Sequence, residues 1–479
     1  MQLRPYQQQM ITDARHALAQ HNRILLVGPT GCGKTVLALR MIKGALDRGK
    51  RVWFLCHRRE LVNQSSRSFW ESHVEHGLIM AGRAMSSLPA SVGVINTLVR
   101  RMDRLQPPDL IIIDEAHRSL SPMYAEVMAE YPDAAVVGLT ATPQRTDGRG
   151  LGEWYDAIVE GPTVRQLIDA GYLAEYEWIA PAESLSLEGV TVRGGDYVEG
   201  EIEKVVDKPK IIGDAIQAYR KHANGKRCKV FCASIKHSIH VCDEYNAAGI
   251  PSVQIDGGHT DKEREEKLRQ FRSGETLVLC SVNLAIEGLD IPAIEAVQML
   301  RPTQSLIVFL QAVGRGLRIE PGKDRCVVLD QVSNWTRHGL PDDERQWTLE
   351  GKKKRKRKDG EDPDIQVQQC GDCYHVFRSG PAECPNCGAD VRKGRGDIEQ
   401  QDGELVKIDP KQHRRQQKIE QGKARTLEEL VQLGQKRGMN KPAQWAAFTF
   451  ASREGRKPTA AEFSRAKRAM TPEHLEGII

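Results

Sequence analysis

Residues 24–35 read ILLVGPTGCGKT, an apolar run followed by a glycine-rich loop and a Lys-Thr pair. A helical stretch, VLALRMIKGAL, follows at residues 36–46. Glycines in such a loop let backbone N–H groups turn toward phosphate, and the N-terminus of the next helix contributes the positive end of its dipole. The stretch therefore predicts a phosphate-binding loop for ATP or GTP, in which Lys34 reaches the β- and γ-phosphates and Thr35 binds Mg²⁺. The expected nucleotide-binding residues of this loop are Gly28, Pro29, Thr30, Gly31, Cys32, Gly33, Lys34 and Thr35.

A second apolar run, LIIIDEAH at residues 110–117, ends in two acidic residues. Ligand sites in α/β folds lie at the carboxyl ends of the strands, where this pair would sit. Asp114 is expected to bind Mg²⁺, directly or through water. Glu115 is expected to orient and deprotonate the attacking water. An acidic strand end without a chemical role is the alternative, which the phosphate loop disfavours.

Short apolar runs alternate with helical stretches twice along the chain. From residue 23 to about residue 143 the runs are ILLVG, VWFLC, VGVIN, LIIIDE and AVVGLT, and the alternation restarts with CKVFCAS at residues 228–234. Apolar runs separated by helices are typical of parallel strands buried on both faces. The expected fold class is therefore α/β, with two tandem parallel-sheet domains.

The composition changes after residue 347. The run GKKKRKRKDGEDPD at residues 351–364 has no apolar periodicity and is typical of a linker. The end of the chain has helical spacing. The expected organisation is a first domain at 1–155, a connector and second domain at 156–347, a basic linker at 348–366, a zinc ribbon at 367–392, and a polar linker with a helical basic tail at 393–479.

The net charge of +5 is unevenly distributed along the 479 residues. Residues 351–479 contain 27 Lys and Arg against 19 Asp and Glu, whereas the first 350 residues contain 42 against 45. A basic tail on a near-neutral body suggests a polyanionic partner, although a solvated linker would look the same. The apolar runs are far shorter than the ~20 residues of a membrane span. With the N-terminal MQLRPYQQQM lacking a signal pattern, we expect no membrane association and a cytoplasmic location.

Four of the eleven cysteines are clustered in CGDCYHVFRSGPAECPNCG. Two C-x2-C pairs offer four thiolates, which suit a closed, tetrahedral and structural Zn²⁺ site made by Cys370, Cys373, Cys384 and Cys387. An iron–sulfur centre is the alternative. His375 is expected at the surface, and metal binding should supply much of this small domain's stability.

These motifs, in this order, resemble those of superfamily 2 helicase-type ATPases of the DEAH/DExH kind. Within that superfamily they are most similar to the RadD-like bacterial DNA repair proteins, and a phage-borne relative would look alike. The further motifs are LRPYQQ (3–8), FLCHRRELVNQ (54–64), VGVINTLVRR (92–101), LTATPQRTDGRG (139–150), VFCASIKHS (230–238), LCSVNLAIEGLDIP (279–292) and QAVGRGLR (311–318). The resemblance implies that both α/β domains are RecA-like.

The resemblance also implies roles for particular residues. Arg4 and Gln7 would read the adenine, and Arg315 and Arg318 would reach the phosphates from the second domain. The other implied nucleotide-binding residues are His117, Gly288, Asp290 and Gln311. Backbone groups at Thr97, Ser234 and Ser281, with Arg58 and Arg100, would contact nucleic acid. These positions make binding independent of base sequence.

Arginines on the second domain reach ATP only when the two domains close, so hydrolysis and closure become one event. The resemblance therefore implies a Mg²⁺-ATP-dependent motor acting on DNA, single-stranded or forked, in repair or recombination. RNA is not excluded. Without a long insertion to serve as a wedge, translocation or remodelling is favoured over unwinding. The alternatives are an RNA helicase, the motor subunit of a restriction or nuclease system, and an inactive ATPase fold that binds nucleic acid. The zinc ribbon or tail could contact a protein partner.

Overall fold

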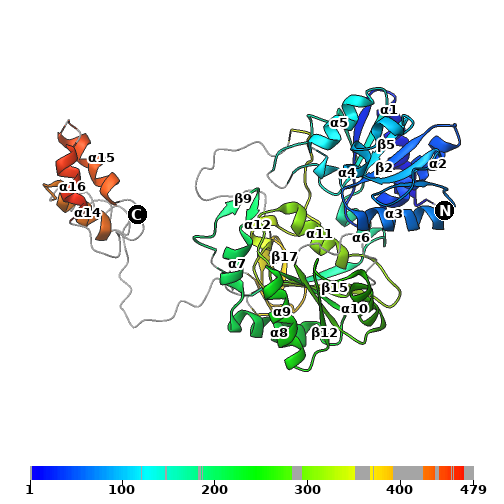
Figure 1. Ribbon diagram of the computed structural model, residues 1–479. Helices are drawn as coiled ribbons and strands as arrows, with labels where there is room; N and C mark the ends of the chain where they lie inside the picture. The colour runs from blue at the N-terminus through cyan, green and yellow to red at the C-terminus, as the bar shows by residue number, and fades with distance from the viewer. Residues whose placement is uncertain are drawn as a thin grey trace. The chain divides into compact units, whose positions relative to one another are not determined.

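The computed structural model describes most of the chain (Figure 1). The described residues are 3–119, 121–145, 148–181, 185, 187–282, 294–350, 367–370, 372–391, 424–436, 442–454, 456 and 458–468. The chain forms two compact units, Met1–Arg395 and Gly396–Ile479. Within the described residues, no helix is both long and apolar enough to cross a membrane.

The first unit begins with a parallel sheet of seven strands in the order β3-β4-β2-β5-β6-β1-β7. Its strands are β1 Arg23–Val27, β2 Val52–Cys56, β3 Gly77–Ile79, β4 Ala90–Val94, β5 Leu110–Ile113, β6 Ala135–Thr140 and β7 Ala157–Glu160. Its helices are α1 Pro5–Leu18, α2 Lys34–Leu46, α3 Arg59–Glu71, α4 Ile95–Val99 and α5 Pro122–Glu130. We call this part the first domain.

Both faces of the first sheet are buried, and β1 illustrates why its sequence is apolar throughout. Ile24 and Leu26 belong to one core cluster, whereas Leu25 and Val27 belong to another. Successive side chains of a strand point to opposite faces, so a strand covered on both faces needs an unbroken apolar run. The prediction of buried parallel strands is therefore confirmed.

A second parallel sheet follows in the order β12-β13-β11-β14-β15-β8. Its strands are β8 Glu175–Ile179, β11 Cys228–Cys232, β12 Ser252–Ile255, β13 Val278–Val282, β14 Ala296–Met299 and β15 Arg325–Asp330. Its helices are α6 Val164–Asp169, α7 Glu199–Val206, α8 Pro209–His222, α9 Ile235–Ala247, α10 Asp261–Ser273, α11 Leu306–Gly316 and α12 Trp335–His338. A short hairpin, β9 Val192–Arg193 and β10 Asp196–Tyr197, precedes α7. We call this part the second domain.

The clustered cysteines lie on a small antiparallel hairpin of β16 Val367–Gln369 and β17 Val376–Arg378. We call the described residues 367–391 the cysteine ribbon. In the described part of the second unit, the helices α14 Leu427–Lys436, α15 Pro442–Glu454 and α16 Ala460–Arg468 pack around a core that includes Leu430 and Ala446. The basic run at 351–366 and the polar stretch at 392–423 lie outside the described residues.

Candidate active site

The phosphate loop joins β1 to α2, as the sequence pattern predicts. Gly33 caps α2 with a φ of +86°, a left-handed conformation that disfavours residues other than glycine. A Cβ atom on Gly33 would also lie 2.5 Å from Gln7 Nε2. Lys34 Nζ donates to the carbonyl oxygens of Gly28, at 3.0 Å, and Pro29, at 3.4 Å. Lys34 is thus directed toward the loop that would hold phosphate.

The LRPYQQ segment holds the same loop from α1. Gln7 Nε2 donates to the carbonyl of Cys32 at 3.1 Å, and the Tyr6 hydroxyl donates to that carbonyl at 2.8 Å. The Gln7 side chain also accepts a hydrogen bond from the backbone N–H of Arg4. The Cys32 side chain is fully buried, and burial raises the pKa of its thiol. Cys32 is therefore an unreactive packing residue in the loop.

Asp114 and Glu115 lie directly after β5, and Glu115 has a positive φ of 50°. Its carboxylate Oε2 lies 3.2 Å from His117 Nδ1 on the same domain. Gln311 Nε2 on α11 of the second domain donates to the same oxygen at 3.2 Å. Burial alone would raise the pKa of Glu115, but the hydrogen bond from His117 and the charges of His117 and Lys34 outweigh it and lower the pKa. Glu115 therefore remains ionised at neutral pH, as a base requires.

A cavity of about 370 Å³ lies between the two domains and is lined by these groups. Its walls include Lys34, Thr35, Asp114 and Glu115 from the first domain, and Gln311, Arg315 and Arg318 from the second. The approach of the two domains is close, because a Cβ atom on Gly314 would lie 2.5 Å from Thr30 Cβ. Acidic and cationic groups that are about 200 residues apart in the chain therefore face one shared cavity.

Tyr172 and Ile319 also line this cavity, and neither was among the residues expected from sequence. The guanidinium of Arg4 lies 4.5 Å from the centre of the Tyr172 ring, and the Tyr6 ring centre lies 5.2 Å from it. An aromatic ring and a planar guanidinium are both groups on which a nucleobase can stack. Tyr172 follows α6, between the recognised motifs, and no local pattern marks it.

The residues expected to contact nucleic acid are placed at the carboxyl ends of strands. Arg58 caps α3 after β2, and Arg100 caps α4 after β4; both are exposed, and Thr97 in α4 is partly exposed. Ser234 follows β11, and its hydroxyl accepts from the backbone N–H of His237 at 3.0 Å. Arg58, Thr97 and Arg100 follow strands whose carboxyl ends share a sheet edge with the acidic pair, and Ser234 lies at the start of α9 in the second domain.

Ser281 differs from the other expected nucleic-acid contacts. It lies within β13, its side chain is fully buried, and its hydroxyl accepts a hydrogen bond from the buried Lys229. Burial lowers the pKa of Lys229 to about 7. Gly288 and Asp290, expected at the nucleotide, lie outside the described residues.

The four cysteines of the ribbon converge. Their Sγ atoms all lie within 4.8 Å of one another. The Cys370–Cys387 and Cys373–Cys384 sulfur pairs are separated by 3.7 and 3.6 Å. A tetrahedral zinc site with Zn–S bonds of ~2.3 Å has sulfur–sulfur edges of roughly 3.8 Å, so the donor set fits this metal. His375 lies outside this group and stacks on Phe377.

Comparison with known proteins assigns this arrangement to a family. Residues 1–145 match the family described as type III restriction enzyme, res subunit, and residues 207–320 match the helicase conserved C-terminal domain. Over 371 residues the chain is 34% identical to a 51.5 kDa protein of a Lactococcus phage, covering 76% of this chain and 78% of that protein. The chain belongs to the helicase-type ATPases of superfamily 2. ATP and Mg²⁺ are the cofactors that membership implies.

One further relative agrees with this assignment, and one solved structure shares the fold. A Schizosaccharomyces pombe protein named as a mitochondrial ATP-dependent helicase, irc3, is 31% identical over 358 residues, which cover 71% of this chain and 59% of that protein. A solved fragment assigned as the HsdR subunit of a type I restriction enzyme from Vibrio vulnificus superposes with a TM-score of 0.55 at 23% identity. The superposition covers 70% of this chain and 65% of that one, and at this identity it establishes the fold alone.

Proposed function

We propose that this helicase-type ATPase is a DNA translocase or remodeller whose ATP hydrolysis is stimulated by single-stranded or forked DNA. The observation that supports this most strongly is the hydrogen bond from Gln311 of the second domain to Glu115 of the first. The base that activates water is thereby linked to the domain that must move. We further propose that the protein acts in the cytoplasm in DNA repair or recombination, as RadD-like proteins do.

The proposed chemistry divides the work between the two domains. Lys34 and the N-terminus of α2 would hold the phosphates, while Thr35 and Asp114 would bind Mg²⁺, which neutralises charge on the phosphate oxygens. Glu115 would accept a proton from the attacking water. Arg315 and Arg318 would stabilise the charge that develops on the transferred phosphoryl group. Turnover would then require the domains to be closed.

Arg58 and Arg100 on the first domain, with the backbone near Ser234 on the second, would contact the phosphates of one strand. Phosphate contacts carry no base specificity, and their strength falls as salt increases. If both domains hold the same strand, each cycle of closing and opening changes the spacing of their contacts. We propose that this change moves the protein along DNA.

We also propose that Cys370, Cys373, Cys384 and Cys387 bind a structural Zn²⁺, which supplies a closed four-thiolate centre and no chemistry of its own. The ribbon or the helical unit would then be available for a protein partner. Chelator-released zinc from the purified chain should approach one equivalent. A preparation containing iron and sulfide instead would contradict the zinc assignment.

The test of the main proposal is an ATPase assay over single strands, duplexes, forks and matched RNA, at two salt concentrations. We expect slow turnover alone and at least tenfold faster turnover with DNA, whereas Lys34→Ala should abolish turnover while DNA binding persists. Turnover unaffected by any DNA would refute the proposal, and stimulation by RNA alone would replace DNA with RNA as the substrate.

A second candidate is the motor subunit of a restriction or nuclease complex. The match of residues 1–145 to the restriction res-subunit family favours it. In this role the cleavage would come from a separate nuclease chain, because the tail of the sequence provides no convincing Asp…Glu-x-Lys core. Recovery of a stable complex that cleaves DNA only with ATP would support it, and a purified chain that remodels DNA without a partner would favour the first proposal.

A further inference from the structure

The cysteine ribbon packs against the edge of the second sheet. β8 is the last strand in that sheet, and its Ile179 forms an antiparallel bridge with His375 of the ribbon. Gln369 Nε2 donates to the carbonyl of Ala180 at 2.7 Å, and Val376 is buried in the core cluster of the second domain. Backbone pairing together with apolar burial makes the ribbon a fixed part of this domain.

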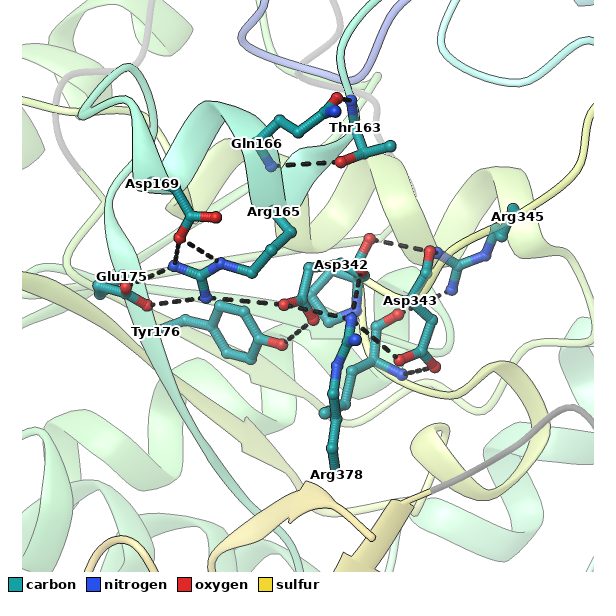
Figure 2. Close-up of polar contacts among 12 residues, drawn as sticks. Thr163, Arg165, Gln166, Asp169, Glu175, Tyr176, Asp342, Asp343, Arg345 and Arg378 are labelled. Carbon is teal, nitrogen blue, oxygen red and sulfur yellow. Dashed lines mark hydrogen bonds and ion pairs between the residues drawn. The ribbon is translucent and has the colours of Figure 1, made fainter. Parts of the chain in front are cut away.

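The ribbon also reaches a buried carboxylate, Asp342, that collects groups from several elements (Figure 2). Arg378 of β17 donates to the Asp342 carbonyl at 2.6 Å and lies 3.6 Å from its carboxylate. The Tyr176 hydroxyl from β8 donates to the same carboxylate, and Arg165 from α6 lies 3.7 Å away. The Asp342 side chain is 5% exposed, so these partners replace the water that would otherwise surround it.

The chain first passes from the first domain to the second at residues 161–165, which we call the first crossing. Arg165 connects this crossing to the Asp342 carboxylate. The backbone N–H of Gly161 donates to the carbonyl of Val27, the last residue of β1, at 2.7 Å. Four residues later, Arg165 is held by Asp169 and Glu175 as well as by Asp342 (Figure 2). The segment that leaves β7, the strand paired with β1 of the phosphate loop, is therefore anchored near Asp342 almost at once.

The chain crosses back to the first domain immediately after Asp342. Leu340 is buried in the core of the second domain, and Arg345 donates to its carbonyl at 2.8 Å. Trp347 and Leu349 pack against a core cluster of the first domain, and the Leu349 carbonyl accepts from the backbone N–H of Gly152 at 2.9 Å. Residues 340–349 thus form a strap from one domain to the other.

The two crossings meet at a small cavity of about 80 Å³ behind the phosphate loop. Gly28 of that loop, Thr163 of the first crossing and Asp343 of the strap line it, together with Gly314 of α11. Arg378 also lies 3.7 Å from Asp343. A change in the ribbon therefore has a short path of contacts to the surface on which α11 meets the phosphate loop.

We propose that Asp342 is a positioning residue through which the cysteine ribbon sets the spacing between the phosphate loop and α11. This inference rests on the proposed function, because the rate that it controls is that of ATP hydrolysis. Docking of the ribbon holds Arg165 and the strap in place, which restricts the relative motion of the domains. Undocking would release both crossings and draw Gln311, Arg315 and Arg318 away from the acidic pair.

The experiment compares Arg378→Ala with Arg269→Ala in the full chain. Arg269 on α10 is a matched control, since it also pairs with two carboxylates, Glu266 and Glu275, on the surface of the second domain. We expect Arg378→Ala to lower kcat about 5- to 20-fold, because misplacement by ~1 Å can cost up to a hundredfold. The KM for ATP should change less than about twofold, since the first domain supplies the phosphate loop.

Hydrogen exchange measured by mass spectrometry separates positioning from a local structural defect. In Arg378→Ala, and in wild-type protein stripped of metal by a chelator, peptides covering 161–170 and 340–349 should exchange faster. Arg269→Ala should match wild type in both kcat and exchange. Tyr176→Phe, which removes one donor to Asp342 and leaves the ribbon intact, should lower kcat in the same direction.

Wild-type kcat in both Arg378→Ala and Tyr176→Phe would overturn the inference. So would faster exchange confined to the ribbon itself. If the wild-type chain has no ATPase activity, the proposed function fails, yet the exchange at 161–170 still decides whether the ribbon controls the crossings.

Discussion

Gly314→Ala would place a methyl group between the two domains at the candidate ATP site. The added Cβ would lie 2.5 Å from Thr30 Cβ and 3.1 Å from both Thr30 Cγ2 and Oγ1. Carbon atoms in contact prefer separations of about 3.5–4.0 Å, so α11 and the phosphate loop must separate by roughly 1–1.5 Å. Because Thr30 Cβ is attached directly to the backbone, rotation of its side chain cannot relieve this contact.

The separation should affect catalysis more than stability. Arg315 follows Gly314 directly on α11, so it would retreat from the phosphates by a similar distance, and ~1 Å of misplacement can reduce a rate by about a hundredfold. In the helix itself, alanine is more favourable than glycine by about 0.5–1 kcal/mol. We therefore expect kcat to fall about 10- to 100-fold without a loss of thermal stability.

The assay is steady-state ATP hydrolysis at saturating ATP and DNA, with thermal unfolding measured on the same preparations. Gly44→Ala in α2 is the matched control, because its added Cβ would approach no atom closer than Arg48 Nη1, at 3.5 Å. That variant should retain wild-type kcat. Wild-type kcat in Gly314→Ala would mean that the contact between Thr30 and Gly314 is absent from the state that hydrolyses ATP.

Three further predictions concern single side chains. Glu115→Gln keeps the size of the side chain but removes the base, so turnover should fall at least 10²- to 10⁴-fold while binding of a fluorescent ATP analogue persists; retained turnover would exclude Glu115 as the base. Tyr172→Ala should raise the KM for ATP about tenfold with little change in kcat, since stacking on a base contributes ~1–3 kcal/mol; an unchanged KM would show that this ring does not contact the base. Burial raises the pKa of Asp330 to about 6, so the folded chain binds this proton more tightly than the unfolded chain does. The protonated carboxyl therefore contributes to the free energy of unfolding at low pH. That contribution is lost as the pH rises from about 4 to 6. Asparagine does not ionise, so between pH 4 and pH 7.5 the free energy of unfolding of Asp330→Asn, measured in urea, should rise by up to about 3 kcal/mol relative to that of wild type. Parallel pH profiles of the two proteins would contradict this.

Local patterns were sufficient for the parts of the site that consecutive residues build. The phosphate loop needs glycines at 31 and 33, which have φ values of +91° and +86°, next to the start of α2, and all of these lie within one short stretch. The acidic pair follows from a buried strand that ends at a sheet edge. The cysteine spacing likewise predicted a converging set of four sulfurs, because each C-x2-C turn brings its own pair together.

Contacts between distant segments could not be anticipated in the same way. Tyr172 lies near Arg4 although it belongs to no motif, and Arg378 of the cysteine ribbon reaches Asp342 although it is not one of the four cysteines that mark that motif. Ser281 illustrates the same limit, because its hydroxyl is enclosed between strands and bonded to Lys229, which is 52 positions away. Such partners depend on how strands and helices pack, and a polar side chain between motifs looks alike in sequence whether it is solvated or buried.

The amino-acid sequence is thus enough to specify two buried parallel sheets, a phosphate loop with its acidic pair and a four-sulfur site, since each depends on periodicity or on residues close together in the chain. Only the folded chain places Gln311 on Glu115, Gly314 against Thr30 and the cysteine ribbon on β8. These contacts join segments separated by about 200 residues or more. Their geometry is set by packing of whole domains, and no local pattern encodes that packing.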